Sequence, residues 1–255
     1  MKKIILMAML ATAFVACEKD EDNNNNGGNN DDNVNTIVVD LGLPSGIKWA
    51  KMNLGANNPW ENGDYYAWGE TQTKSNYEWS TYKYCKGSLN NLTKYCNKAS
   101  YGNDHFTDEL ISLQAIDDAA TAVLGTDYRI PTFADWNELN GQCYWVWTSN
   151  YNNQNVSGYI VYKAKSNNDK GVKVYNEGTP SSSYSLSDTH IFLPAAGGFD
   201  TSSFNVGYVG YYWSASLYEE FPCNARYCNF VSRDVDISYY GDRFYGFSIR
   251  PVSQQ

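Results

Sequence analysis

The chain has 255 residues, a formal net charge of -9 and 18% charged residues, and it contains 22 tyrosines against 10 phenylalanines. The acidic balance argues against a nucleic-acid partner, because phosphate backbones require basic patches. After the first segment, no apolar run approaches the ~20 residues needed to cross a bilayer. The composition is that of a globular chain unusually rich in tyrosine.

The chain opens with Lys2 and Lys3, an apolar stretch over residues 4–16, and Cys17. This pattern is typical of an export signal. The letters FVAC, residues 14–17, resemble a bacterial lipobox, in which the cysteine is acylated. We predict a lipoprotein signal peptide over residues 1–16 and lipidation of Cys17; the alternative is an ordinary cleaved signal with an incidental cysteine. Two or three acyl chains would anchor the protein firmly, since one chain binds membranes only marginally.

Residues 17–36 form an acidic, asparagine-rich segment. Its start, CEKDED, resembles the signal that sends lipoproteins of Bacteroidetes-type bacteria to the outer face of the outer membrane; a plain solvated tether is the alternative. Residues 23–35 have almost no apolar side chains to offset the entropy of ordering. We predict a flexible linker and a lipid-anchored protein exposed at the cell surface.

Residues 37–255 are predicted to form one domain. A first strand, TIVVDLG, leads into a turn at residues 44–46. A helix is expected over roughly residues 108–124, closed by Gly125. Its apolar positions near helical spacing are Leu110, Leu113, Ile116, Ala120 and Val123.

A second helix is predicted to begin at Thr132, whose side chain can cap it, with Asp135 three residues later. Trp136 and Leu139 would form its buried stripe. The remainder is short strands and turns. Two helices and a run of strands predict an α+β domain with mostly antiparallel sheets.

The C-terminal stretch VSRDVDISYYGDRFYGFSIRPV alternates polar and apolar residues, which predicts a strand with one wet face. Val235 and Ile237 would point into the core. The opposite face would carry polar side chains, with aromatic residues beside them: Ser232, Asp234, Asp236, Ser238, Tyr239, Phe244 and Tyr245.

Several segments together resemble the Fibrobacter succinogenes major paralogous domain family, which is abundant in lipoproteins of gut Bacteroidetes. They are LGLPSGIKWAKMNLGA, GDYYAWGET, YEWSTYKYCKG, LTKYC, YRIPTFADWNEL, IFLPAAGG, YYWSAS and GFSIRPV, and they span nearly the whole domain in the family's order. The resemblance implies a C-type lectin-like fold, in the variant shared with sulfatase-modifying factors and with the variable proteins of diversity-generating retroelements.

In those retroelement systems, randomised AAC codons in a C-terminal window encode Tyr, Asp, Ser, Phe, Cys or Asn. The resemblance therefore implies a variable ligand-binding region over residues 208–250. Tyrosine with Ser, Asn and Asp is also the composition of a binding surface, although tyrosines that merely cover a sheet would look the same. The predicted ligand-binding residues are Tyr208, Tyr211, Tyr218, Phe221, Tyr227, Asn229, Ser232, Asp234, Asp236, Ser238, Tyr239, Tyr240, Asp242, Phe244 and Tyr245. The interleaved residues Trp213, Ala215, Leu217, Ala225 and Ile249 would supply scaffold.

Catalytic and metal-binding patterns are absent from the sequence. His105 and His190 lack a second ligand at metal spacing, which favours ordinary surface or loop positions, and no cofactor, metal site or enzyme activity is predicted. The five cysteines after Cys17 cannot all pair internally, and their pairing stays open. Cys223 and Cys228 allow an oxidase hypothesis, because sulfatase-modifying factors use cysteines in this part of the fold, but PCNARYC does not reproduce that site.

These patterns together predict a surface-anchored, lectin-fold binding protein. It would act as an adhesin toward an extracellular protein or glycan, and its ligand face would lie in the C-terminal third. The alternative is a structural or pilus-tip component whose tyrosines bury against a partner subunit.

Overall fold

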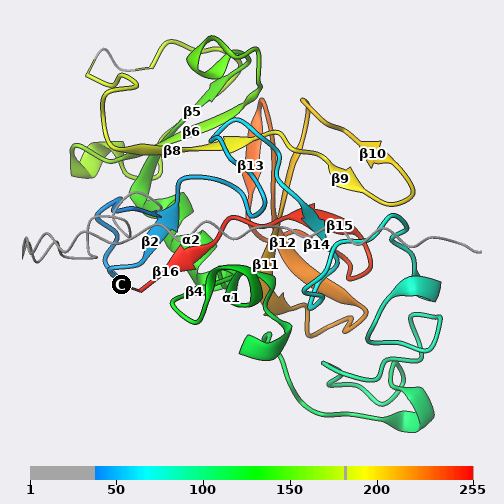
Figure 1. The fold of residues 1–255 in the computed structure, drawn as a ribbon. Coiled ribbons are helices and arrows are strands. Elements are labelled where there is room, and N and C mark those ends of the chain that lie inside the picture. The colour runs from blue at the N-terminus through cyan, green and yellow to red at the C-terminus, as the bar shows by residue number, and fades with distance from the viewer. Residues whose placement is uncertain (1–37, 181–182, 255) are drawn as a thin grey trace, which may run out of the picture.

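The structure is a computed structural model that describes residues 38–180 and 183–254. Three sheets, mostly of antiparallel strands, and two α-helices make a mixed α+β fold, which confirms the predicted class (Figure 1). Within the described residues, no helix is both long and apolar enough to cross a bilayer. The predictions for the signal peptide, Cys17 and the linker lie outside the described residues.

The first sheet joins the two ends of the described chain. Its strands, in spatial order, are β1 (Val38–Val39), β2 (Lys48–Ala50), β16 (Val252–Ser253) and β4 (Tyr128–Arg129). Val252 is the register partner of both Trp49 and Arg129, so the last strand lies in the middle of this sheet. The predicted first strand and the turn after it are present, since the amide of Gly46 donates to the carbonyl of Leu43.

The central sheet carries the C-terminal third of the chain. Its main path is β10 (Ser203–Phe204), β9 (Gly198–Phe199), β15 (Gly246–Ser248), β11 (Gly210–Leu217), β12 (Asn224–Val231) and β13 (Asp234–Asp236). Two further strands join it: β14 (Tyr240–Asp242) beside β12, and β3 (Tyr65–Tyr66) beside β15. The pair of β11 with β15 is parallel, and the other pairs are antiparallel.

The third sheet lies at the upper left of Figure 1 and packs against the central sheet, since Tyr159 and Phe230 share one core. Its order is β7 (Lys173–Val174), β5 (Cys143–Thr148), β6 (Gly158–Lys163) and β8 (His190–Pro194). β5 and β6 are almost entirely buried. Strands covered on both faces contain continuous apolar runs, and CYWVWT and GYIVYK are of that kind.

Helix α2 (Phe133–Gln142) forms as predicted. The Thr132 side chain accepts from the amide of Asp135, and the Asp135 side chain accepts from the amide of Thr132 in return. This reciprocal capping box satisfies amides that the first turn leaves unpaired. Trp136 and Leu139 are fully buried.

The first predicted helix is too long. Only α1 (Ala119–Leu124) is α-helical, after a short 3-10 turn at Ala115–Asp117. Upstream, the amide of Leu113 donates to the carbonyl of Ala215, so this part of the chain lies along the edge of β11. Asp118 caps α1 through the amide of Thr121. Ile116 and Val123, two of the apolar positions near helical spacing, are 78% and 53% exposed.

The two faces of the central sheet bury two different cores. Tyr212 and Phe230 point into the first core, with Trp49, Trp136 and Trp145. Trp213, Ala215, Leu217, Ala225 and Ile249, all predicted as scaffold, lie in the second core, with Trp68 and Phe247. Neighbouring strand residues alternate between the two, as pleated geometry requires.

The predicted wet-faced strand is shorter than expected. Val235 and Ile237 are buried in the first core, which confirms their predicted direction. Ser232, however, belongs to the two-residue turn between β12 and β13 and not to a strand. Its backbone carbonyl accepts from the amide of Asn176, outside the central sheet.

Two arginines hold the C-terminal segment, and neither forms an ion pair with a carboxylate among the residues that the structure describes. Arg250, fully buried, donates to the carbonyls of Ala50, Lys51 and Phe192, and burial lowers its pKa to about 10. Arg243, also fully buried, donates to the carbonyls of Lys94 and Tyr95. Backbone carbonyl groups thus accept hydrogen bonds from each guanidinium in the place of water. A buried charge requires such partners.

Candidate ligand-binding face

A concave cluster of aromatic rings opens to solvent at the edge of the second core. It is lined by Asp200, Phe204, Tyr211, Tyr227, Tyr245 and Phe247 and encloses about 320 Å³. We call these six residues the aromatic cup. They come from β10, β11, β12 and β15 and the turns beside them, so the central sheet fixes their positions.

Phe247 forms the floor of the cup. The ring of Tyr211 stacks on it at 4.9 Å and 17°, and the ring of Tyr245 lies parallel to it at 5.7 Å and 4°. Phe204 touches both tyrosines, at 5.8 and 6.0 Å between centroids. Tyr227 closes the remaining side, 5.8 Å from Tyr211 and 5.0 Å from Phe247. The rings hold one another at offset and edge geometries that aromatic pairs prefer.

Polar atoms border this apolar floor. The Tyr211 hydroxyl accepts from the Asn205 side chain at 2.9 Å. Within the described part of the chain, the hydroxyls of Tyr227 and Tyr245 have no hydrogen-bond partner. Burial raises the pKa of both tyrosines above the usual range, so they remain protonated donors at neutral pH.

Asp200 is the charged residue of the cup. Backbone hydrogen bonds from Ser202 and Thr201 lower the pKa of its carboxyl below the ordinary value. Those bonds go to Oδ1. Oδ2 has no partner in the described ranges and is left to face a ligand.

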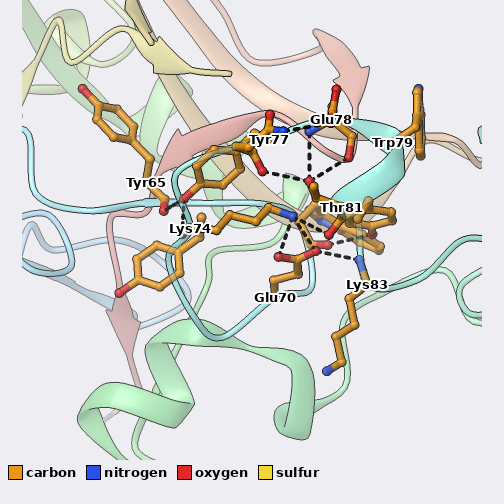
Figure 2. Close-up of polar contacts among 12 residues, drawn as sticks. Tyr65, Glu70, Lys74, Tyr77, Glu78, Trp79, Thr81 and Lys83 are labelled. Carbon is orange, nitrogen blue, oxygen red and sulfur yellow. Dashed lines mark hydrogen bonds and ion pairs between the residues drawn. The ribbon is translucent and has the colours of Figure 1, made fainter. Parts of the chain in front are cut away.

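The segment over residues 70–83, whose polar contacts are drawn in Figure 2, contacts Asp200 and other residues next to the cup. The amide of Tyr77 donates to the carbonyl of Asp200. The centroid of the Tyr77 ring lies 5.7 Å from that of Phe199. Trp79 lies edge-on to Phe244, 5.2 Å away. The chain therefore braces the backbone on either side of the cup.

An ion pair fixes this supporting segment. The Lys74 ammonium lies 2.9 Å from the carboxylate of Glu70, which also accepts from the amide of Lys83 (Figure 2). Lys74 further donates to the carbonyl of Thr81. Because Glu70 is only 8% exposed, this network orders a segment that contains no strand and no α-helix.

Glycines make room for the rings at two places. A Cβ on Gly198 would come within 2.6 Å of Phe204 and 3.0 Å of Phe247. A Cβ on Gly241 would come within 3.0 Å of Tyr227. Both distances are too close for a side chain, so the shape of the cup depends on these glycines.

The structure divides the predicted ligand-binding residues between two faces of the sheet. Tyr211, Tyr227 and Tyr245 belong to the cup, with Tyr239 5.9 Å from Tyr227 and Phe244 4.3 Å from Tyr245. Tyr227 is only 9% exposed. It belongs to the wall of the cup because it shares its side of the sheet with the scaffold residue Trp213, its register partner.

The acidic strand β13 continues the cup side of the sheet. Asn229 is the register partner of both Tyr211 and Asp236. Since directly opposed residues share a face, Asn229 and Asp236 lie on the side of Tyr211, and Asp234 follows two residues earlier on the same side. Ser238 donates to Asp236 through its amide and its hydroxyl.

A second aromatic cluster lies on the opposite face, which corrects the prediction of a single face. It consists of Phe133, Tyr218, Phe221, Arg226 and Tyr240, and we call it the Arg226 patch. The rings of Tyr218 and Tyr240 stack at 3.8 Å and 4°. The Arg226 guanidinium lies 5.1 Å from the Tyr218 ring and 4.6 Å from the Phe133 ring. Tyr240 and Arg226 are register partners and therefore share this side.

Tyr208 and Asp242 also lie outside both clusters. Tyr208 is 77% exposed in the turn before β11. Asp242 accepts from Asn224 at 3.2 Å, and burial raises the pKa of its carboxyl.

Three residues of the cup were missed by sequence reasoning: Asp200, Phe204 and Phe247. For Phe247 a signal existed, since it lies two residues before the scaffold residue Ile249 and shares its side of the strand. Asp200 and Phe204 reach the cup through the pairings of β9 with β10 and of β9 with β15. No local sequence pattern predicts these pairings.

The five cysteines over residues 38–254 are free thiols. Cys223 precedes β12 and Cys228 lies inside it, so five residues of extended chain separate them by roughly 16 Å. Burial raises the pKa of Cys223 to about 11 and that of Cys228 further still. Neither thiol is activated, and the two do not face each other as a pair.

The histidines are separate, as expected, but His190 is not in a loop. It begins β8, its Nε2 lies 3.0 Å from the Tyr151 hydroxyl, and burial lowers its pKa. His105 is exposed. Over the described ranges, no cluster of three or more His, Cys, Asp or Glu residues is placed to hold a metal ion.

Comparisons of the chain with family models, with curated proteins and with solved structures find no match.

Proposed function

We propose that this protein is a binding protein of the bacterial cell surface, lipid-anchored at Cys17 in the outer membrane, and not an enzyme. Its ligand site would be the aromatic cup, carried on a C-type lectin-like domain of the Fibrobacter succinogenes major paralogous type. The motifs across residues 41–252 support the family, and the first 36 residues support the anchor. The main support for a binding function is the aromatic cup.

The cup has the properties of a recognition site. Its volume of about 320 Å³ falls within the range of ligand sites, which are concave, mostly apolar and bordered by a few polar groups. Tyrosines give large contact area at low entropic cost, and their hydroxyls add directional bonds. Because strands of one sheet hold the rings, little ordering remains to oppose binding.

The test is a pair of matched tyrosine variants measured on glycan and protein arrays. Tyr245→Ala removes a wall of the cup, and Tyr240→Ala removes a ring of the Arg226 patch. If the cup binds the ligand, Tyr245→Ala weakens binding by about 2 kcal/mol or more, as expected of an aromatic anchor. Tyr240→Ala then binds as the parent protein does, and melting temperatures show that both variants fold.

A second candidate follows from the Arg226 patch, where Phe221 is 42% and Tyr240 43% exposed. Exposed rings of this kind suit a subunit contact in a structural or pilus-tip assembly. The same variants separate the two functions. Loss of binding in Tyr240→Ala, with Tyr245→Ala unaffected, would reject the cup and favour the assembly role.

A further inference from the structure

Aromatic rings elsewhere in the molecule hold the chain's own cations. The Lys83 ammonium lies 4.6 Å from the Tyr84 ring, and the Lys165 ammonium 4.8 Å from the Tyr184 ring. The Arg243 guanidinium lies 5.2 Å from the Trp68 ring. Attraction of a cation to the face of a ring explains these pairs, which lie within the usual ~6 Å.

The aromatic cup is different, because no lysine or arginine lines it. Within the described residues, none of its five rings pairs with a cation. The nearest arginine along the chain, Arg226, points to the other face. No side chain that lines the cup therefore supplies a cation to its rings.

The charge around the cup is negative. Asp200 lines it, with a free Oδ2 oxygen. Asp236 lies on the Tyr211 side of the sheet, and Asp234 follows on the same side. A cation entering the cup would meet the tyrosine rings of its walls and the carboxylate of Asp200, in a protein whose formal net charge is -9.

The geometry favours a flat cation that also donates hydrogen bonds. Tyr211 and Tyr245 are both nearly parallel to Phe247, so a planar group can stack along them. The Asp200 carboxylate and the tyrosine hydroxyls offer acceptor oxygens, which a quaternary ammonium could not use. A guanidinium is planar, stacks on aromatic faces and carries five N–H donors in a fixed fork.

We propose that the aromatic cup receives the guanidinium of an arginine side chain presented by a protein ligand, an inference that rests on the proposed binding function and specifies its ligand. The guanidinium stacks against the parallel rings and donates to Asp200. Asp234 and Asp236 raise the local concentration of a basic partner.

The test uses blocked tripeptides with the full chain, measured by isothermal titration calorimetry. Acetyl-Gly-Arg-Gly-amide is compared with the same peptide carrying citrulline, a neutral side chain of nearly the same shape. The arginine peptide should bind at least about tenfold more tightly, because only it has the charge. Equal affinities, or no binding of the arginine peptide at about 10 mM, would overturn the proposal.

Asp200→Asn provides the second measurement. Asparagine keeps an Oδ1 acceptor for the amides of Thr201 and Ser202, so the turn is preserved. Affinity for the arginine peptide should fall about tenfold, since the charge partner is lost. Asp127→Asn is the control, because it changes net charge equally at an exposed site outside the cup. Equal losses in both variants would show a general charge effect and reject the specific contact.

The two proposals fail in different ways. In one outcome, a ligand found on the arrays does not bind Tyr245→Ala, but the arginine peptide does not displace it from the parent protein. The proposed binding function then stands, and the proposal of an arginine ligand is rejected. An array ligand unaffected by Tyr245→Ala rejects both.

Discussion

The aromatic cup and the Arg226 patch have similar rings but opposite electrostatics. Each groups tyrosine and phenylalanine around β12, and the neighbouring residues Arg226 and Tyr227 point one to each. The Arg226 patch contains its own guanidinium, whereas the cup contains a carboxylate. β12 thus has, on one side, an aromatic surface that already holds the chain's own cation. On its other side is an aromatic surface with a carboxylate, which attracts cations.

The largest expected difference between these regions is in stability. Phe247 is 3% exposed and Phe221 is 42% exposed. Phe247→Ala should lower the free energy of unfolding by about 3–5 kcal/mol, because it empties the cup floor and part of the second core. Phe221→Ala should change it by only about 0.5 kcal/mol.

Chemical denaturation of both phenylalanine variants checks this difference. If both variants lose a similar free energy of unfolding, Phe221 contributes to the core as much as Phe247 does. The expected difference in stability between the two regions would then be wrong.

A smaller effect is expected from removing the internal cation. Arg226→Gln should lower the free energy of unfolding by about 0.5–1 kcal/mol, because two ring contacts lose their charge. Arginine-peptide affinity at the cup should not change, since Arg226 points to the opposite face. Denaturation and calorimetry on one preparation measure both, and weaker peptide binding in this variant would mean that the two faces are coupled.

The smallest expected effect is that of pH on the cup. Backbone hydrogen bonds lower the pKa of Asp200, so its carboxylate is charged above the ordinary carboxyl pKa of about 3.9. The raised pKa values of Tyr227 and Tyr245 keep both hydroxyls protonated. Arginine-peptide affinity should therefore stay constant from about pH 8 to about pH 5 and fall only as Asp200 protonates below about pH 4.

Calorimetric titrations across that range test the pH prediction. A midpoint near neutral pH would contradict the assignment of this titration to Asp200.

Sequence reasoning succeeded where a few neighbouring residues determine the conformation. The Thr132 and Asp135 capping box lies within one helical turn, so its signal is local. Val235 and Ile237 were assigned to the core by alternation alone, and both are 8% exposed. Such patterns decide structure without reference to distant residues.

Sequence reasoning failed where distant pairing overrode local preference. Helical spacing over residues 108–124 was real, yet Leu113 pairs with Ala215, about a hundred residues away. Hydrogen bonds to β11 satisfy this backbone as a helix would have done, and they also place Leu113 against the second core.

The predicted binding face was half right for a related reason. The side of each residue depends on its place in the strand, because neighbouring strand residues point to opposite faces. Tyr211 lies in the cup, on the side of the second-core residue Trp213, whereas Tyr218, which directly follows β11, lies in the Arg226 patch.

The position of the last strands has a consequence for the timing of folding. β16 lies between β2 and β4, and β15 joins β9 and β3 to β11. Two sheets therefore have a gap in their interior until residues 246–253 have been synthesised. Contacts between such distant segments form slowly, because long loops must close first. These two sheets are completed only when residues 246–253 have left the ribosome, so Phe247, the floor of the cup, is put in place after the strands on either side of it.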